Sequence, residues 1–473
     1  MVFSSITFLL YFLPLFLLVY YLSPRKLKNF IVLIFSVFFY AWGAPKFIFI
    51  LLGSTVATFY LVKWMDSNKK RLHKRWLLGL SIFINIGFLA FFKYANFFVD
   101  NLNDVFQSLG YNTVAWTRIV LPIGISFYTF QTLTYAVDVY RGVHRPLNKL
   151  SNYVLYIIMF PQLIAGPIVR YNEIADQIVD RRETYNDRLL GFYRFAIGLA
   201  KKVLIANVMG AKADEILSMD FTSLDSTTAW IGILAYTFQI YFDFSGYSDM
   251  AIGIGRMIGF KFPENFDNPY TSRSITEFWR RWHMTLGAWM KNYLYIPLGG
   301  NKVKTNRRLY FNLWFVFLLS GLWHGAAWNF IIWGGFHGFF LVAERLFLSK
   351  LLKKAGGFLS LSYTFFITVM GWVIFRIENY QDAFMFYKRL FAFDFKAYDF
   401  YHEAEFAFWL VVSILFSFLV VFPYGKKIQE KVFYSDYNRA GLITGFVISL
   451  LLVFLCVSAI ATSDFNPFIY FRF

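Results

Sequence analysis

Long apolar blocks separated by short basic segments dominate the pattern of this chain. Residues 30–40, 82–92, 309–322 and 440–461 are such blocks, and several approach or exceed the ~20 residues with which a helix crosses a bilayer. A helix satisfies its own backbone hydrogen bonds inside lipid, where no water can do so. The pattern therefore predicts an all-α polytopic membrane protein.

The basic clusters between the blocks predict the topology. Lys and Arg concentrate at residues 25–28, 69–75, 141–149 and 426–431, and loops rich in Lys and Arg remain in the cytoplasm. The blocks and clusters together give about ten to eleven spans plus re-entrant and interfacial helices. An even count of ten places both termini on the extracytoplasmic side.

Three segments differ from simple spans. Residues 153–167 are short, apolar, interrupted by prolines and flanked by basic loops, which is typical of a re-entrant segment. Residues 263–300 mix aromatic and basic side chains, and we expect them to lie along the cytoplasmic interface. Residues 309–346 are largely apolar with basic residues at both ends, so we expect a re-entrant hairpin with its tip at Gly321 and Gly325.

Composition excludes several classes of protein. The chain is 58% hydrophobic and 22% aromatic, with a net charge of +18. Its cations lie in separate loops rather than in one stripe, so we expect membrane lipid and no nucleic acid as a partner. The single Cys456 rules out a disulfide framework and a Cys-based metal site. No repeat or linker divides the sequence, which predicts one membrane domain over residues 1–473 with an extracytoplasmic tail at residues 463–473.

The first candidate for chemistry is His324, which stands among apolar residues and glycines at the predicted hairpin tip. Ionisable residues inside a bilayer are costly and mark functional sites. A buried imidazole without a charged partner stays neutral, as a general base must be. The alternative is a histidine that only bonds a neighbouring helix. His337 follows 13 positions later, about 220° around a continuous helix, and is expected to be structural.

His283 is the second candidate, 41 residues before His324. It could assist the base or orient the substrate, and an ordinary interfacial histidine explains its position equally well. The two histidines lack the spacing and the nearby acid of a metal site. We therefore predict no metal.

Polar residues also gather within an apolar block at residues 241–249. Asp243, Ser245 and Asp249 suggest a broken helix that lines a polar tunnel, to which Trp323 beside His324 would also belong. The alternative is that each carboxylate caps a helix or pairs with an arginine.

Three cations are candidates for the phosphates of a coenzyme at the cytoplasmic mouth of the tunnel. They are Arg280, Arg281 and Lys291, and a guanidinium binds phosphate through two parallel hydrogen bonds. The competing explanation is that they are ordinary cytoplasmic cations of the positive-inside rule.

Several motifs together resemble the membrane-bound O-acyltransferases, in particular members that O-acetylate bacterial polysaccharides such as alginate, cellulose and peptidoglycan. The resemblance runs along nearly the whole chain. It is carried by six motifs, namely Phe39–Gly43, Leu121–Tyr128, Phe160–Pro167, Asp243–Asp249, Phe278–His283 and Gly321–Gly325.

The resemblance implies a ring of tilted spans around a thin waist in the bacterial inner membrane. It implies acetyl-CoA as the acyl donor, with no tightly bound cofactor, and a catalytic histidine at the position of His324, with His283 as the second polar position. It also implies a separate extracytoplasmic acetyltransferase of the SGNH hydrolase type as a partner and a polysaccharide as the acceptor.

The C-terminal residues 468–473 resemble the F-x-Y-x-x-F ending found in the related teichoic acid D-alanylation machinery. There the tyrosine is thought to carry the acyl group, which points to Tyr470 here. The topology independently predicts that Tyr470 lies outside the cytoplasm. The alternative for this ending is an aromatic membrane anchor.

These observations predict an O-acetyltransferase that moves acetyl across the membrane. A transporter or polysaccharide exporter would use the same broken helices and buried acids, although we find no inverted repeats. A scaffold that only docks an extracellular enzyme would leave His324 unexplained.

Overall fold

A computed structural model describes residues 2–434, 437–463 and 465–468. These described residues form helices and connecting segments without any strand, so the all-α prediction is confirmed. The chain packs as two compact units, and the second contains the candidate site residues that the structure describes. Two packing units do not decide whether the chain forms one membrane domain or two, so the single domain over residues 1–473 stays a prediction.

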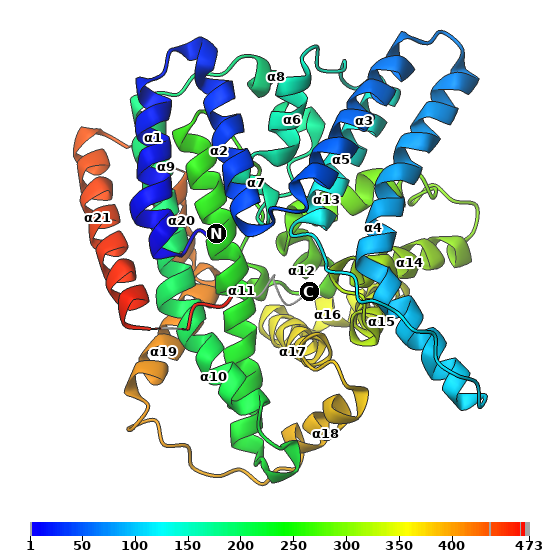
Figure 1. Cartoon of the computed structure of the whole chain (residues 1–473). Coiled ribbons are helices and arrows are strands. Elements are labelled where there is room, and N and C mark those ends of the chain that lie inside the picture. Colours follow the sequence, from blue (N-terminus) through cyan, green and yellow to red (C-terminus); the bar gives the residue numbers. More distant parts are fainter. Residues whose placement is uncertain (1, 435–436, 464, 469–473) are drawn as a thin grey trace. The chain divides into compact units, whose positions relative to one another are not determined.

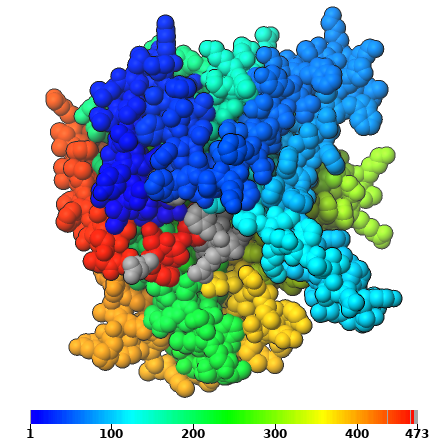
Figure 2. Space-filling view, viewed as in Figure 1, coloured from blue at the N-terminus to red at the C-terminus, as the bar shows by residue number. Residues whose placement is uncertain are grey.

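The first unit consists mainly of residues 7–182. It begins with the π-helical turn η1 (Thr7–Phe12) and includes the short turn η2 (Arg25–Leu27). Its α-helices are α1 (Leu13–Leu22), α2 (Lys28–Gly43), α3 (Ile48–Ser67), α4 (Arg71–Ser108), α5 (Ile125–Tyr140), α6 (Leu150–Ile158), α7 (Phe160–Leu163) and α8 (Tyr171–Val179). The blue surface in Figure 2 belongs to the first of these helices.

The predicted re-entrant segment corresponds to α6 and α7. Both helices are short, and the chain turns between them at Met159, whose neighbours are fully buried. Gly124, at the start of α5, has a positive φ of 75°, and a Cβ there would lie 2.6 Å from the Leu163 carbonyl oxygen. The LPIG motif therefore allows α5 to begin directly against α7.

The second unit consists mainly of residues 183–258 and 264–468 among those described. Its α-helices are α9 (Tyr185–Ala200), α10 (Asn207–Leu217), α11 (Ser226–Met257), α12 (Ile275–Arg281), α13 (Met284–Trp289), α14 (Asn306–His324), α15 (Trp328–Ala343), α16 (Ser349–Ala355), α17 (Gly357–Arg376), α18 (Tyr380–Leu390), α19 (Ala404–Phe418), α20 (Pro423–Phe433) and α21 (Arg439–Thr462). Shorter turns join them, namely η3 (Lys201–Ala206), η4 (Phe221–Ser223), η5 (Pro269–Thr271), η6 (Met290–Tyr295), η7 (Glu344–Leu348) and η8 (Leu419–Val421).

Helix α11 forms the core of the second unit, and α9 and α10 run beside it (Figure 1). Small residues bring α9 and α11 together: a Cβ on Gly198 would lie 2.5 Å from the Gly246 carbonyl oxygen, and one on Gly253 would lie 2.6 Å from that of Gly191. Such small residues let membrane helices approach closely. We expected a break near residues 241–249, and this expectation was wrong because α11 is continuous there.

The described residues include seven helices that are long and apolar enough to cross a membrane. They are Arg25–Gly43, Ile48–Ser67, Arg71–Ser108, Trp328–Ala355, Gly357–Arg376, Ala404–Val421 and Arg439–Thr462. These helices support a polytopic membrane protein, while the count of ten to eleven spans stays a prediction.

Candidate active site

His324 is the last residue of α14, and its side chain is 8% exposed. The chain turns at Gly325 and returns as α15, so a helical hairpin is present in the 309–346 segment. Its re-entrant placement in the membrane stays a prediction. A Cβ on Gly321 would lie 2.1 Å from the Phe330 carbonyl oxygen. This close contact between the two arms holds the imidazole at the turn.

Aromatic rings surround the His324 imidazole. The ring centroids of Trp323, Trp333 and Phe375 lie 5.0, 5.2 and 5.3 Å from that of His324, each nearly perpendicular to it. These three rings come from α14, α15 and α17. They form a low-dielectric environment in which hydrogen bonds to a reacting group are stronger than in water.

His283 joins α12 to α13 and adopts the left-handed backbone conformation, with φ of 45°. This conformation is uncommon for residues other than glycine, although asparagine, aspartate and histidine adopt it more often than the rest. It reverses the chain between two short helices, and the His283 side chain is only 2% exposed. Its ring lies 4.7 Å from Phe244 and 5.9 Å from Trp323, centroid to centroid. The Trp323 indole thus contacts both His283 and His324.

Asn265 fixes the protonation of His283. Its Oδ1 lies 3.0 Å from His283 Nδ1 and also accepts from the hydroxyl of Thr285 at 2.8 Å, while its Nδ2 donates to Ser248 Oγ at 3.0 Å. Since this amide oxygen can only accept, His283 Nδ1 must donate, which leaves Nε2 with a lone pair. Among the described residues, Nε2 has no hydrogen-bond partner.

The charge state of His283 follows from its surroundings. Burial, with a smaller contribution from nearby His324, lowers the pKa of His283 well below its ordinary value of 6.5. The ring is therefore neutral near pH 7. Its Nε2 lone pair can accept a hydrogen bond, either from a substrate hydroxyl or from the His324 imidazole.

Glu344 anchors the segment that carries His283. This buried carboxylate accepts hydrogen bonds from the first backbone N–H groups of α12, at 2.6 Å from Ile275 and 3.0 Å from Thr276. A carboxylate at a helix N-terminus satisfies unpaired donors and complements the helix dipole. The 263–300 segment is thereby fixed to the end of the hairpin, while its place at the membrane interface stays a prediction.

His337 has a different environment. Its ring is fully buried against Trp279 and Trp333, at centroid distances of 4.9 and 5.0 Å. Neither ring nitrogen has a hydrogen-bond partner among the described residues. A Cβ on Gly371 would lie 2.7 Å from His337 Nε2, so this imidazole fills a packing position between α15 and α17.

The faces of α11 separate the predicted tunnel residues. At 100° per residue, Phe244 and Ser248 lie on the side of His283 and Asn265, while Asp243 and Tyr247 lie on the next side. Ser245 and Asp249 lie on a third. The structure therefore brings Asp243 to one place and Ser245 and Asp249 to another, and Trp323 belongs to the histidine site.

Asp243 forms a buried ion pair with Lys202 of η3. The Lys202 Nζ lies 2.9 Å from Asp243 Oδ1, and the two side chains are 3% and 2% exposed. Lys202 also donates to the side chain of Asn207 at 2.7 Å and to the carbonyl of Pro467. One buried cation thus ties the C-terminal segment to α11.

Both ends of the described chain contact this face of α11. The Tyr247 ring stacks between Phe3 and Phe468, at centroid distances of 4.5 and 4.6 Å. Asn466 donates to the Ser4 carbonyl at 2.8 Å. The segment that precedes Tyr470 is therefore held one helical turn from Phe244, which contacts His283. Tyr470 itself lies outside the described residues.

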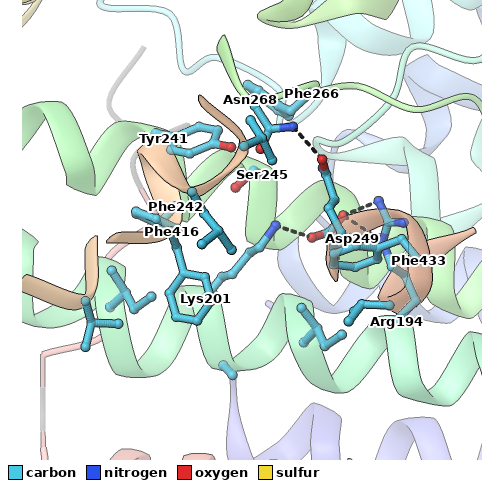
Figure 3. A pocket seen from close by; sticks show the side chains of 18 of the residues that line it. Arg194, Lys201, Tyr241, Phe242, Ser245, Asp249, Phe266, Asn268, Phe416 and Phe433 are labelled. Atoms are coloured by element: carbon cyan, nitrogen blue, oxygen red, sulfur yellow. Dashed lines mark hydrogen bonds and ion pairs between the residues drawn. The ribbon is translucent and has the colours of Figure 1, made fainter. Parts of the chain in front are cut away.

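Ser245 and Asp249 line a cavity of about 370 Å³ on this third side of α11 (Figure 3). Lys201 Nζ and Arg194 Nε reach Asp249 from two sides, at 2.7 and 2.8 Å. Arg194 also pairs with Glu264 at 2.6 Å. The pairing alternative for Asp249 is thus confirmed, and it explains why the helix needs no break.

The three predicted phosphate-binding cations are near the surface. Arg280 and Lys291 are exposed, whereas Arg281 pairs with Glu277 at 2.8 Å. None of the three lines the cavity described above. Their role in holding a coenzyme stays a prediction.

Sequence reasoning missed Asn265, Lys202, Lys201 and Arg194. Arg194 and the two lysines lie within the largely apolar residues 189–211, so the cost of charge inside a bilayer is a usable signal for them. Asn265 stands in a polar loop beside other Asn and Asp residues, where no pattern distinguishes it.

A helical membrane protein with one buried histidine at a hairpin turn and a second at the α12–α13 junction is consistent with acyl transfer, and the comparisons identify the family. Residues 34–377 match the sequence model of the membrane-bound O-acyltransferase family. The chain is 45% identical to the probable alginate O-acetylase AlgI of Pseudomonas aeruginosa over 83% of this chain and 75% of that protein. It is 40% identical to the AlgI protein of Azotobacter vinelandii over both full lengths.

A relative of another name is the peptidoglycan O-acetyltransferase of Helicobacter pylori, with 38% identity over 81% of this chain and 78% of that protein. The protein described here belongs to the membrane-bound O-acyltransferase family. It is an acyltransferase of the membrane.

Proposed function

We propose that this protein takes acetyl from cytoplasmic acetyl-CoA and passes it across the membrane for O-acetylation of a bacterial polysaccharide such as alginate, cellulose or peptidoglycan. The observation that carries the proposal is the pairing of His324 with His283 around Trp323, inside an aromatic enclosure at a hairpin turn. The names of the relatives support acetyl as the group and a polysaccharide as the final acceptor.

In the proposed reaction His324 is the general base. It takes the proton from an attacking hydroxyl, whose oxygen bonds to the thioester carbonyl carbon. The carbon–sulfur bond then breaks, and the thiolate leaves as coenzyme A with the proton from the imidazolium. The products are an acetyl ester and the free thiol. A thioester is reactive enough for one well-placed base to give a large part of the acceleration.

His283 orients the attacking hydroxyl in this scheme. Its Nδ1 proton is committed to Asn265, so its Nε2 can accept a hydrogen bond. Arg280, Arg281 and Lys291 are proposed to hold the phosphates of acetyl-CoA at the cytoplasmic face, with no cofactor retained between turnovers. No metal takes part in the scheme.

Tyr470 is the proposed attacking hydroxyl. The Lys202 contacts and the Tyr247 stack hold residues 466–468 next to the histidine face of α11, which supports delivery of a residue just beyond them. The acetyl tyrosine would then pass its group to the nucleophile of an extracytoplasmic SGNH-type acetyltransferase, and from there to the polymer.

The hydroxyl of Tyr470 can be tested separately from its ring. Tyr470→Phe keeps the aromatic anchor and removes the nucleophile, so we expect polymer acetylation in cells to fall by about a hundredfold or more. Phe471→Leu at the neighbouring position is the matched control and should retain most activity. Normal acetylation by the Tyr470→Phe protein would remove the tyrosine from the scheme.

A transporter is the competing function, and one assay separates the two. Purified protein is incubated with labelled acetyl-CoA and a tyrosine-containing acceptor peptide, and free coenzyme A is measured. We expect thiol release that depends on the acceptor. Movement of label across a vesicle without thiol release would instead identify a transporter.

A further inference from the structure

The cavity beside α11 is amphipathic. Its polar residues gather where α9, α11 and α20 meet, and include Arg194, Lys201, Ser245, Asp249 and Gln429. Its apolar wall comes from η3, α19 and α21. The residues of that wall include Leu204, Val412, Phe416 and Leu452. A cavity with one polar and one apolar side fits a molecule that is itself divided in this way.

The polar side contains an unused hydrogen-bonding group. The Ser245 side chain is 2% exposed, lines the cavity, and has no hydrogen-bond partner among the described residues. A buried hydroxyl without a partner costs free energy. A ligand that offers an acceptor, such as an ester carbonyl or a phosphate oxygen, would remove this cost.

The apolar wall is made by helices that face lipid. Both α19 and α21 belong to candidate spans, and only 17% and 11% of their apolar windows are buried inside the protein. The lining residue Phe416 is itself 53% exposed. The hydrocarbon of the surrounding bilayer is therefore the apolar material nearest to this wall, and part of the red and orange surface in Figure 2 belongs to these helices.

Helix α20 supplies charge at the polar side. Its residues Ile428, Gln429, Val432 and Phe433 line the cavity, and the Phe433 ring lies 4.6 Å from the Arg194 guanidinium. Elsewhere α20 contains three lysines and one acidic residue, Glu430, so the helix has a net positive charge. These lysines are Lys426, Lys427 and Lys431. Basic residues beside a pocket between membrane helices attract anionic lipid head groups.

We propose that this cavity is a binding site for one anionic glycerophospholipid of the bilayer. One acyl chain lies along α19, η3 and α21, the ester region bonds Ser245, and the phosphate head group lies at α20. The site is separate from the histidines because it uses a different face of α11. The bound lipid would fill the space between the helices that line the cavity. Lys201 and Arg194, which pair with Asp249, lie on its polar side.

Photolabelling tests this site without any measurement of acetyl transfer. The full chain is reconstituted in phosphatidylcholine vesicles with a trace of phosphatidylglycerol that carries a diazirine in its acyl chain, and adducts are located by mass spectrometry. We expect adducts on the wall formed by Val412, Phe416 and Leu452. Unlabelled phosphatidylglycerol should compete about tenfold better than phosphatidylcholine.

Two valines on α19 provide a matched pair. Val412 lines the cavity, whereas Val411 is 65% exposed and does not line it. Val412→Trp fills the cavity and should reduce labelling there about tenfold, whereas Val411→Trp should leave it unchanged. Ser245→Ala is a second test that remains usable if Val412→Trp disturbs folding. It removes only the hydroxyl, and it should weaken labelling several-fold.

The lysines are tested in the same way. Replacing Lys426, Lys427 and Lys431 by Gln should abolish the preference for phosphatidylglycerol, and Lys353→Gln with Lys354→Gln should preserve it. Equal labelling of the two tryptophan variants, or equal competition by both lipids, would overturn the proposal. Displacement of the label by acetyl-CoA would also overturn it, by assigning the cavity to the acyl donor.

Discussion

At the scale of single residues, the two histidines of the site are held in different ways. His324 is fixed by the turn of a hairpin and by three rings around it, whereas His283 is fixed by a hydrogen bond from its Nδ1 to Asn265. The first arrangement encloses the imidazole in a low-dielectric site, which suits the role of base that we propose for His324. The second sets which nitrogen of His283 keeps a lone pair.

Asn265→Leu tests whether that hydrogen bond positions His283. The change keeps the side-chain volume but removes the acceptor, so His283 can carry its proton on the wrong nitrogen. We expect kcat to fall about tenfold or more with little change in KM for acetyl-CoA. Asn265 is a positioning residue in this account, and the split between kcat and KM distinguishes that role from loss of substrate binding.

Asn312→Leu is the control for Asn265→Leu. Asn312 is also fully buried. Its side chain donates to the Leu298 carbonyl at 3.2 Å, whereas that of Asn265 bonds His283. Both variants should lose about 1–3 kcal/mol of stability. An equal loss of kcat in the two would mean that Asn265 acts only through stability.

The sequence alone singled out His324 and His283 as candidates, because an ionisable group near an apolar hairpin is rare enough to stand out. The structure shows that both side chains are buried and that both rings contact Trp323, while their catalytic roles stay a prediction. It could not identify Asn265, because an asparagine in a polar loop is common. Only the fold shows that the Asn265 side chain reaches His283 and Thr285 at the start of α13.

At the scale of elements, α11 organises the second unit by presenting a different contact on each side. Glycines face α9, Phe244 faces His283, Asp243 faces Lys202, and Ser245 faces the cavity. The sequence showed that this helix contains polar residues, but the lining of a polar tunnel stays a prediction. It could not predict a continuous helix, because the cations that neutralise the carboxylates come from another part of the chain.

Lys202→Met tests the link between α11 and the C-terminal segment. Removing one member of a buried ion pair leaves the Asp243 charge uncompensated and typically costs about 3–5 kcal/mol. We therefore expect lower thermal stability in detergent and loss of acetyl transfer. Lys212→Met also removes a buried cation, but its two partners, Glu215 and Glu403, have carboxylates that are 53% and 31% exposed, so water can solvate them and the variant should cost less.

The double variant Lys202→Met with Asp243→Leu separates stability from positioning. Replacing both charges by apolar groups should recover most of the stability, while the Pro467 carbonyl still lacks its donor. Acetyl transfer should remain low in the double variant. Full recovery of activity together with stability would show that the ion pair does not position the tail.

At the scale of the whole molecule, the pattern of apolar blocks and basic loops predicted a helical membrane protein, and the helices and the family confirm it. The hairpin was predictable because basic residues flank the apolar stretch at both ends, and the positive-inside rule assigns both ends to the same side of the membrane. The number of spans could not be obtained in this way. A long helix that is buried within the protein, such as α11, has the length and the apolar residues of a span, so the sequence pattern does not distinguish the two.

Cysteine labelling in intact cells tests the predicted topology. The native Cys456 is buried, so new cysteines can be read against a low background. We expect Ser463→Cys to react with a membrane-impermeant maleimide in intact cells, and Lys70→Cys to react only after permeabilisation. The opposite result would place the C-terminal tail in the cytoplasm and exclude its proposed role outside.

The measurement that tests the central claim most directly compares two buried histidines in purified protein. His324→Gln and His337→Gln are assayed for release of coenzyme A from acetyl-CoA in the presence of the acceptor peptide, with thermal unfolding measured on the same samples. We expect His324→Gln to lose at least about a hundredfold in kcat with its fold intact, and His337→Gln to lose activity only as far as it loses stability. A folded His324→Gln protein with wild-type turnover would contradict the account.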